Sequence, residues 1–230
     1  MKIVLAALNS KYIHTNLAIR YLNQYVKDVT PVEIIEFTIN QTIDSIVGEI
    51  FKRKPDILGI STYIWNIEYT LKISEIIKRI HPETKILLGG PEVSFDGINL
   101  LKEHKFIDYI IYGEGEETFR EFLTNHKLSE IKGLIYRDGV EIIKNPPKTL
   151  MHNLGEIPSP YEDIGDEFKN KIVYYESSRG CPFSCKFCLS STIKGVRYFP
   201  IDRVKKDILN LIKSGVRQVK FVDRTFNANK

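Results

Sequence analysis

The chain of 230 residues contains only three cysteines, Cys181, Cys185 and Cys188, which lie together in one short segment with the spacing C-x3-C-x2-C. Thiolates bind soft metals such as zinc and iron, and three of them on one loop can converge on a single metal centre. An odd number of cysteines cannot form a closed disulfide framework. Because four thiolates would complete a zinc site or fully ligate a four-iron cluster, three leave one coordination position for a substrate or cofactor.

Zinc binding and dithiol chemistry are the alternatives for this segment. A zinc site of three cysteines and one histidine needs a nearby histidine, but the nearest one upstream is His152 and none follows the cysteines. A redox-active pair of Cys185 and Cys188 would leave Cys181 without a role. An iron–sulfur centre is therefore the favoured interpretation.

The cysteine spacing, with the aromatic Phe187 directly before the last cysteine, resembles the signature of the radical S-adenosylmethionine (SAM) enzymes. The resemblance implies that Cys181, Cys185 and Cys188 hold three irons of a 4Fe-4S cluster, while the amino and carboxylate groups of SAM chelate the fourth iron. It also implies that reduction of the cluster cleaves SAM to methionine and a 5′-deoxyadenosyl radical. The electron would come from an external donor such as flavodoxin or ferredoxin.

Residues around the cysteines are candidates for contacts with the cluster or with SAM. Gly180 is expected to permit a turn, and the charge of Arg179 to offset the negative cluster thiolates. Phe187 either contacts adenine through its backbone, which is favoured, or packs against the barrel. Asp223 and Asn227 stand where the family usually has a Gly-Gly-Glu-like segment, and they either accept hydrogen bonds from the SAM amino group or cap a strand end.

Apolar runs and helical stripes alternate along the first part of the chain. A short apolar run predicts a buried strand, and apolar residues three or four positions apart predict the buried face of a helix. Such alternation with short connections predicts a parallel, doubly wound α/β sheet of the Rossmann or flavodoxin type. The predicted strands are residues 2–8, 32–37, 56–62, 85 to the glycine turn at 89–90, and 106–112; the predicted helical stripes are 17–22, 43–50, 69–80 and 119–123.

Ligands of such sheets lie across the carboxyl ends of the strands, so the loops that begin at Asn9, Ser61, Gly89 and Gly113 are the candidate binding loops. The second loop offers hydroxyl groups, and the last two contain glycines that allow a ligand to approach the backbone closely. For any single loop, a simple turn is the alternative explanation for its glycines. The candidate residues in the last three loops are Ser61, Thr62, Tyr63, Gly89, Gly90, Pro91, Gly113, Glu114 and Gly115.

Four motifs together resemble the cobalamin-binding domain that precedes the radical SAM domain in one large subfamily. They are Asn9-x-Lys-Tyr12-Ile-His14, Ser-Thr-Tyr-Ile-Trp-Asn at 61–66, Gly-Gly-Pro-Glu at 89–92 and Tyr-Gly-Glu-Gly-Glu at 112–116. The resemblance implies that the corrin ring and its nucleotide tail lie over these four loops.

The first loop departs from the wider cobalamin-binding family, in which Asp-x-His-x-x-Gly supplies a histidine ligand to cobalt. Only His14 matches, because Tyr12 and Leu17 occupy the other two positions. His14 is either a cobalt ligand or a residue of the loop and helix start, and the second is favoured because no carboxylate orients its other nitrogen. Trp65 is either a ligand contact or a packing residue of the following helix.

The remaining chain predicts a boundary and the start of a second domain. Asp138-Gly139 between two short apolar runs predicts a hairpin that closes the first domain, residues 1–143. The proline-rich residues 144–170 predict an extended linker. Residues 171–230 predict a strand at 171–176, with the cysteine loop at its carboxyl end, a helix between Pro200 and Gly215 and a strand at 216–222. The resemblance to radical SAM enzymes implies that these elements are the first βαβ part of a truncated partial TIM barrel. The chain is therefore expected to be an incomplete form of a longer protein.

Composition excludes several other classes. A net charge of +4 with both signs interspersed is too weak to predict nucleic-acid binding. No apolar run is long enough to span a membrane, and the apolar start ends at Asn9 and Ser10, too early for a signal peptide. We therefore expect a cytoplasmic protein, in a compartment that keeps thiols reduced.

The favoured hypothesis is the amino-terminal part of a cobalamin-dependent radical SAM enzyme that methylates an unactivated carbon, or performs a related radical modification, on a small-molecule or unknown substrate. One alternative is a cobalamin-binding or sensing module whose cysteines hold a structural metal. A second is a radical SAM enzyme that no longer binds cobalamin. The missing barrel separates the first alternative from the enzyme, because a sensor does not need it.

Overall fold

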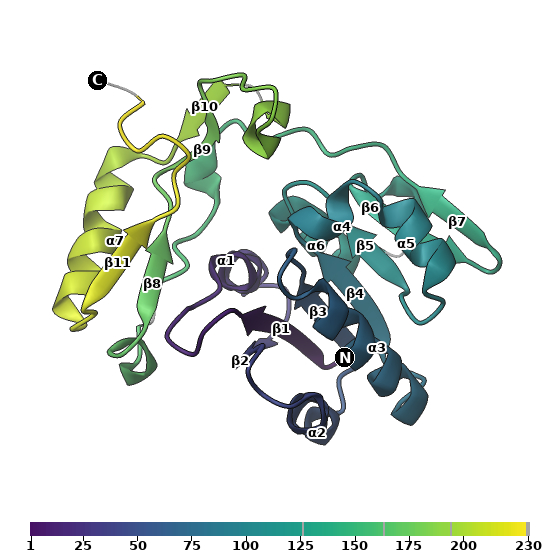
Figure 1. The fold of residues 1–230 in the computed structure, drawn as a ribbon. Coiled ribbons are helices and arrows are strands. Elements are labelled where there is room, and N and C mark those ends of the chain that lie inside the picture. Colours follow the sequence, from purple (N-terminus) through teal and green to yellow (C-terminus); the bar gives the residue numbers. More distant parts are fainter. Residues whose placement is uncertain (126, 163, 194, 229–230) are drawn as a thin grey trace. The chain divides into compact units, whose positions relative to one another are not determined.

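The protein is described by a computed structural model that covers residues 1–125, 127–162, 164–193 and 195–228 (Figure 1). The chain divides into two compact units. The first unit contains residues 1–12 and 18–149, and the second contains residues 13–17 and the chain from Leu150 onward.

The first unit is built on a seven-stranded sheet in the order β2-β1-β3-β4-β5-β6-β7. The first five strands in this order are parallel, and β6 and β7 are antiparallel to their neighbours. This order confirms the predicted doubly wound fold of flavodoxin type. The strands are β1 (Ile3–Asn9), β2 (Val32–Thr38), β3 (Ile57–Ser61), β4 (Lys85–Gly89), β5 (Tyr109–Ile111), β6 (Leu134–Asp138) and β7 (Glu141–Lys144).

Helices cover both faces of this sheet, and α1 and α2 lie on opposite sides of β1 and β2 in Figure 1. One buried cluster joins alternate residues of β1 to α2, α3 and α5, and a second joins the other residues of β1 to α1 and α6. Every residue of β1 is therefore buried, which explains its nearly continuous apolar sequence. The helices are α1 (Leu17–Tyr25), α2 (Ile43–Arg53), α3 (Ile67–Ile80), α4 (Pro91–Ser94), α5 (Gly97–Glu103), α6 (Glu116–Thr124) and the 3-10 turn η1 (Leu128–Glu130).

Two features of the first unit differ from the sequence predictions. The strand predicted at 106–112 is only Tyr109–Ile111, and the hairpin around Asp138-Gly139 pairs with it as two further strands of the same sheet. The glycine turn after β4 leads directly into α4 and α5, which the sequence analysis did not assign. Both helices are short, so their apolar residues give little periodic signal.

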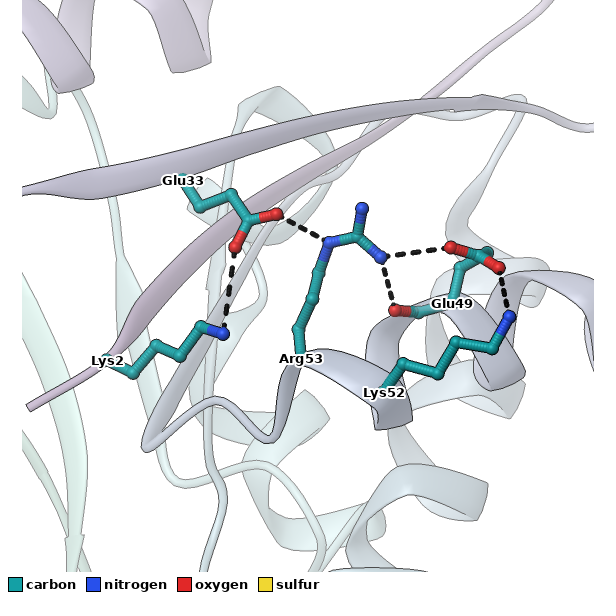
Figure 2. A network of polar contacts seen from close by, with 5 residues as sticks. All are labelled: Lys2, Glu33, Glu49, Lys52 and Arg53. Carbon is teal, nitrogen blue, oxygen red and sulfur yellow. Dashed lines mark hydrogen bonds and ion pairs between the residues drawn. The ribbon is translucent and has the colours of Figure 1, made fainter.

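A chain of alternating charges joins the amino-terminal ends of β1 and β2 to the last turn of α2 (Figure 2). Glu33 binds the Nε atom of Arg53 at 2.6 Å and the Nζ atom of Lys2 at 3.9 Å, and Glu49 binds Arg53 at 3.0 Å and Lys52 at 2.7 Å. Hydrogen bonds from Lys52 and Arg53 lower the pKa of the Glu49 carboxyl group. Such partly exposed pairs contribute little to stability.

The second unit contains a strand–helix–strand pattern. Strand β8 (Ile172–Tyr175) pairs in parallel with β11 (Gln218–Phe221), and α7 (Ile201–Lys213) connects them in sequence. The buried carboxylate of Asp207 on α7 accepts a hydrogen bond from the hydroxyl of Tyr175 at 3.0 Å. Burial and the Asp207 charge both raise the pKa of Tyr175, so its hydroxyl remains a donor.

The cysteines lie in the connection between β8 and α7. This connection contains a second antiparallel pair, β9 (Ser178–Cys181) and β10 (Gly195–Tyr198), and the 3-10 turn η4 (Leu189–Thr192). The cysteine segment thus follows β8, and its first part forms β9, which ends at Cys181. The position after a parallel strand is where barrel folds place functional loops.

Residues 13–17 belong to the second unit although they follow β1 in sequence. The carbonyl of Ile13 accepts a hydrogen bond from the Ile172 amide at 2.6 Å, and the Thr15 hydroxyl donates to the Ile172 carbonyl at 3.0 Å. His14 forms an isolated parallel bridge with Ile172. This short segment therefore pairs alongside β8.

Part of the segment expected to be an extended linker is packed within the second unit. It includes the 3-10 turns η2 (Leu154–Glu156) and η3 (Asp166–Phe168), and Leu154, Ile157, Tyr161 and Phe168 are buried. The guanidinium group of Arg203 on α7 donates hydrogen bonds to the carbonyls of Leu154 at 3.3 Å and Pro158 at 3.2 Å, and also to that of Ile157. Prolines interrupt the periodicity of this segment without preventing its burial.

Within the described residues, no helix has the length and apolar character needed to cross a membrane.

Candidate functional site

The loops singled out in the first unit start side by side at the carboxyl edge of its sheet. Ala7 of β1 is in register with Ser61 of β3, Ser61 with Gly89 of β4, and Gly89 with Ile111 of β5. The order β2-β1-β3 makes the β1–β3 pair the point at which the direction of winding reverses. Ligands of doubly wound folds bind at this position.

Asn66 fixes the loop between β3 and α3. Its side chain is almost fully buried, at 1% exposed, and donates to the carbonyls of Leu8 and Ser61, both at 3.1 Å. It also accepts a hydrogen bond from the Tyr63 amide at 2.8 Å. The sequence analysis quoted this asparagine within a motif but assigned it no role. An asparagine just before a helical stripe is a local signal for such a loop-fixing residue.

The loops after β3 and β4 are in backbone contact. The Thr62 amide donates to the Gly89 carbonyl at 2.6 Å, and the Glu92 amide donates to the Thr62 carbonyl at 3.4 Å. Gly90 has φ 111° and ψ 175°, a conformation essentially restricted to glycine, and a Cβ atom there would overlap the Thr62 carbonyl oxygen. Gly90 was predicted to let a ligand approach the backbone. Its lack of a side chain is needed in any case for the close approach of the loop after β3.

The loop after β5 combines two glycines with different requirements. Gly113 has φ 80°, and a Cβ atom there would face open space. Its amide donates at 3.4 Å to the Ser94 hydroxyl, which in turn donates to the Gly90 carbonyl at 2.8 Å. Gly115 precedes α6, where a side chain would press on Leu22 at 3.3 Å. Glu114 lies between these two glycines.

Large apolar side chains are exposed on the same loops. Trp65 is 47% exposed and stacks on Tyr63, with the ring centroids 4.5 Å apart and the planes within 8°. Ile64 is 77% exposed, and Tyr12, in the loop after β1, is 72% exposed. Exposed apolar side chains on binding loops are suited to a flat, largely apolar ligand. Trp65 thus stacks on a residue of its own loop, and its contact with a ligand stays a prediction.

Asn9 and His14, two of the three candidate residues near β1, fall in different units. Asn9 ends β1, is buried in the first unit, and accepts a hydrogen bond from the Ile39 amide at 3.0 Å. His14 belongs to the second unit, where its Nδ1 atom lies 3.1 Å from the Tyr174 hydroxyl and its ring meets that of Tyr174 edge-on. His14 therefore contacts Tyr174 within the second unit, and its favoured role as a residue of the loop and helix start stays a prediction.

The three cysteines are not joined in disulfides and are at least partly exposed. Cys181 ends β9, and Cys188 precedes η4, with its amide donating to the Cys185 carbonyl at 3.1 Å. Among the described residues, no three side chains of His, Cys, Asp or Glu are gathered closely enough to hold a metal ion. The donor set nevertheless suits a soft metal centre, because all three groups are accessible thiols on one exposed connection. Closure around a centre would require the loop to draw the sulfur atoms together.

Hydrogen bonding favours the thiolate form of Cys188. The backbone amide and the hydroxyl of Ser190 lower the pKa of this thiol, with smaller contributions from Arg224 and the Ser191 amide. Metal ligation and nucleophilic attack both require the thiolate. The lowered pKa of Cys188 therefore favours both metal ligation and nucleophilic attack by its sulfur.

The three neighbouring candidates have separate environments. Arg179 forms an ion pair with Glu176 at 2.7 Å, so its charge is already balanced by a carboxylate. Gly180 has φ 95°, and a Cβ atom there would overlap the Gly195 carbonyl of β10; the glycine therefore permits strand pairing rather than the expected turn. Phe187 is 94% exposed, so its ring does not pack in this conformation.

Known proteins are similar to this chain over its first unit and, in some cases, over nearly its whole length. Residues 3–123 match the B12 binding domain family model. An uncharacterized methyltransferase PH0819 of Pyrococcus horikoshii is 32% identical over 93% of this chain and 50% of its own length. The cobalamin-dependent radical SAM methyltransferase TokK of Streptomyces tokunonensis is 30% identical over 75% of this chain and 28% of its own length. The chain therefore spans half or less of the length of these curated relatives.

Solved structures of the same fold extend over nearly the whole chain. The cobalamin-dependent SAM radical enzyme OxsB superposes with a TM-score of 0.81 at 24% identity, over 98% of this chain and 34% of its own. The radical SAM methyltransferase TsrM of Kitasatospora setae superposes with a TM-score of 0.78 at 18% identity, over 98% of this chain and 48% of its own. At these identities, the similarity establishes the fold of the chain and confirms the predicted fold class.

We expect Gly90→Ala to destabilise the protein and Gly48→Ala to stabilise it. At Gly90, the backbone conformation alone costs a non-glycine residue about 1–3 kcal/mol, and the overlap with Thr62 adds to this. At Gly48, inside α2, a Cβ atom has no neighbour within 4 Å, so alanine should contribute about 0.5–1 kcal/mol. Urea unfolding followed by circular dichroism measures both; equal midpoints for Gly90→Ala and the parent protein would contradict the assignment.

We also expect Cys188 to be alkylated by iodoacetamide at lower pH in the folded protein than in denaturant. The lowered pKa of Cys188 increases its thiolate fraction below the ordinary titration range of a thiol. Ser190→Ala removes one of the stabilising hydrogen bonds and should move the midpoint upward. Mass spectrometry of the labelled peptides at a series of pH values provides the measurement, and a Cys188 midpoint unaffected by folding would refute the expectation.

Proposed function

The chain belongs to the B12-binding domain family, and from this premise we propose that it carries the cobalamin-binding domain and the cluster-binding segment of a cobalamin-dependent radical SAM enzyme. The observation that carries the proposal is the combination of two features in one chain. A doubly wound domain matches the B12-binding model, and a C-x3-C-x2-C segment follows the first strand of a βαβ unit. The relatives TokK and OxsB are themselves named as cobalamin-dependent radical SAM enzymes.

Each group of residues has a defined task under this proposal. Cys181, Cys185 and Cys188 hold a 4Fe-4S cluster and leave one iron for SAM. When bound, the cluster would supply the electron that cleaves SAM, and cobalamin would supply methyl-transfer chemistry. Asn66 and Gly90 hold the loops on which cobalamin rests, and the stacked rings of Tyr63 and Trp65 provide an apolar surface for it. The chain thus binds and positions its cofactors, which must react away from water.

The proposed reaction is methyl transfer to an unactivated carbon of a small-molecule substrate, or a related radical modification. Curated relatives include both methyltransferases and a cyclase, so the reaction class is broader than methylation. The proposed electron source is a small external carrier such as flavodoxin or ferredoxin. A cytoplasmic location would keep the three thiols reduced and available to iron. Substrate contacts are assigned to the parts of the relatives that extend beyond this chain's match.

The central test is anaerobic reconstitution with iron and sulfide, followed by electron paramagnetic resonance (EPR) of the reduced protein. A four-iron signal that changes on addition of SAM is expected, because SAM occupies the iron without a cysteine ligand. Cys185→Ala should abolish the signal, whereas Ser184→Ala, an exposed residue of the same loop, should retain it. A tightly held zinc ion that iron does not replace would instead support a binding module with a structural metal.

A titration with hydroxocobalamin, followed by its visible absorption spectrum, tests the first domain separately. Trp65→Ala should weaken binding by about 3- to 10-fold, the effect of losing one aromatic contact. Phe51→Ala, which removes an exposed aromatic ring from α2, should leave the affinity unchanged. A protein that forms the SAM-responsive cluster but does not alter the cobalamin spectrum would belong to the radical SAM enzymes that no longer bind cobalamin.

A further inference from the structure

The segment that follows β11 is hydrogen-bonded to the start of the cysteine connection. Asp223 accepts hydrogen bonds from the Ser177 amide at 3.0 Å and the Ser177 hydroxyl at 2.8 Å, and from the Ser178 hydroxyl at 2.5 Å. All three donors converge on the same carboxylate oxygen, Oδ1, and the Ser177 amide also lies 3.2 Å from Oδ2. The carboxylate therefore binds Ser177, directly before β9, and Ser178, the first residue of β9.

Parallel pairing explains why these residues meet. Phe221 of β11 is in register with Tyr175 of β8, and the Val222 amide continues the ladder by donating to the Tyr175 carbonyl at 2.8 Å. Asp223 and Ser177 each come two residues after the registered pair, so the strand ends place them opposite one another. The hydrogen bonds from the two serines give Asp223 a structural role at the strand end, the second of the two roles considered for it.

The same segment also reaches the first cysteine. The Oγ1 atom of Thr225 lies 3.7 Å from the Sγ atom of Cys181, within the distance of a hydrogen bond to sulfur. Cys181 is held on its other side by pairing with Gly195 of β10, and Gly180 permits the close approach of these strands. The first cysteine is therefore fixed by the backbone of β10 and by a side chain from the segment after β11.

The direction of this hydrogen bond follows from the protonation state of the sulfur. In the free thiol either atom can donate, but a thiolate that binds iron has no proton, so the Thr225 hydroxyl must be the donor. A hydrogen bond to a ligand sulfur stabilises the more negative, reduced state of a cluster more than the oxidised state. In a protein that holds the cluster, this contact would therefore make the cluster easier to reduce.

We infer that Asp223 and Thr225 are positioning residues for the cluster site: Asp223 anchors the start of the cysteine connection through Ser177 and Ser178, and Thr225 raises the reduction potential through Cys181. This inference rests on the proposed function, because it requires that the cysteines hold a cluster. It assigns to the segment after β11 a role in tuning the cluster. Neither residue needs to touch SAM for this role.

An EPR-monitored redox titration of the reconstituted protein tests the role of Thr225. Thr225→Val keeps the side-chain shape but removes the hydroxyl, and it should lower the equilibrium constant for cluster reduction about tenfold, which is about 59 mV for a one-electron couple. Thr225→Ser should restore the parent potential. Thr192→Val is the matched control, because the Thr192 hydroxyl donates to the Leu189 carbonyl at 2.7 Å rather than to a thiol.

Limited trypsin digestion of the iron-free protein tests Asp223 without any cofactor. Asp223→Asn should increase severalfold the rate of cleavage after Lys186, an exposed residue of the cysteine connection, because the neutral amide holds the serines less tightly. Asp202→Asn, on the exposed first turn of α7, should leave this rate unchanged.

The outcomes separate this inference from the proposed function. If the parent protein forms a SAM-responsive cluster but Thr225→Val leaves its potential unchanged, the inference about Thr225 is wrong and the proposed function stands. If Lys186 is cleaved at the parent rate in Asp223→Asn, the anchoring role is wrong. If the parent protein holds only zinc, the proposed function itself fails, and the tuning role fails with it.

Discussion

Parallel pairing between strands that are distant in sequence is the constraint on which both parts of this molecule depend. In the first unit, the register of β1 with β3 and of β3 with β4 brings the loops after these strands to one edge. In the second unit, the register of β8 with β11 brings Ser177 opposite Asp223. Parallel strands place their carboxyl ends together, so residues with no local relationship in the sequence become neighbours.

Gly90, Gly113 and Gly180, three of the candidate glycines, are not required for the same physical reason. Gly90 and Gly180 are required because a neighbouring backbone occupies the space that a Cβ atom would fill. Gly113 has open space around its Cβ position, so only its positive φ of 80° favours glycine there. Glycines that look alike in the sequence are thus required for close backbone packing at some positions and for backbone conformation alone at another.

The fold class could be predicted from the sequence because its determinants are local. The apolar runs of β1 and β3 and the helical stripes of α2 and α3 are each visible within a few residues, and the resemblance to cobalamin-binding radical SAM proteins is confirmed by the family match and the relatives. The hairpin was predicted, but its pairing with β5 was not, since the strand partner is not encoded in the turn.

The details of the site depend on interactions that no local pattern reveals. Thr15 and Ile172 are 157 residues apart in sequence, and the contact between Thr225 and Cys181 needs the register of two strands to be known. Asn66 carried a local signal, but its buried hydrogen bonds to the end of β1 could not be read from it. Which loop residues touch cobalamin, SAM or a cluster stays a prediction.

The membership of residues 13–17 in the second unit has a consequence for how this architecture can be inherited. Neither unit is a single continuous stretch of chain, since the partner segment of β8 is encoded just after β1. A gene rearrangement that transferred the second unit alone would leave that edge of β8 without its partner, and unpaired strand edges promote aggregation. The two units are therefore expected to be passed on together rather than exchanged as independent modules.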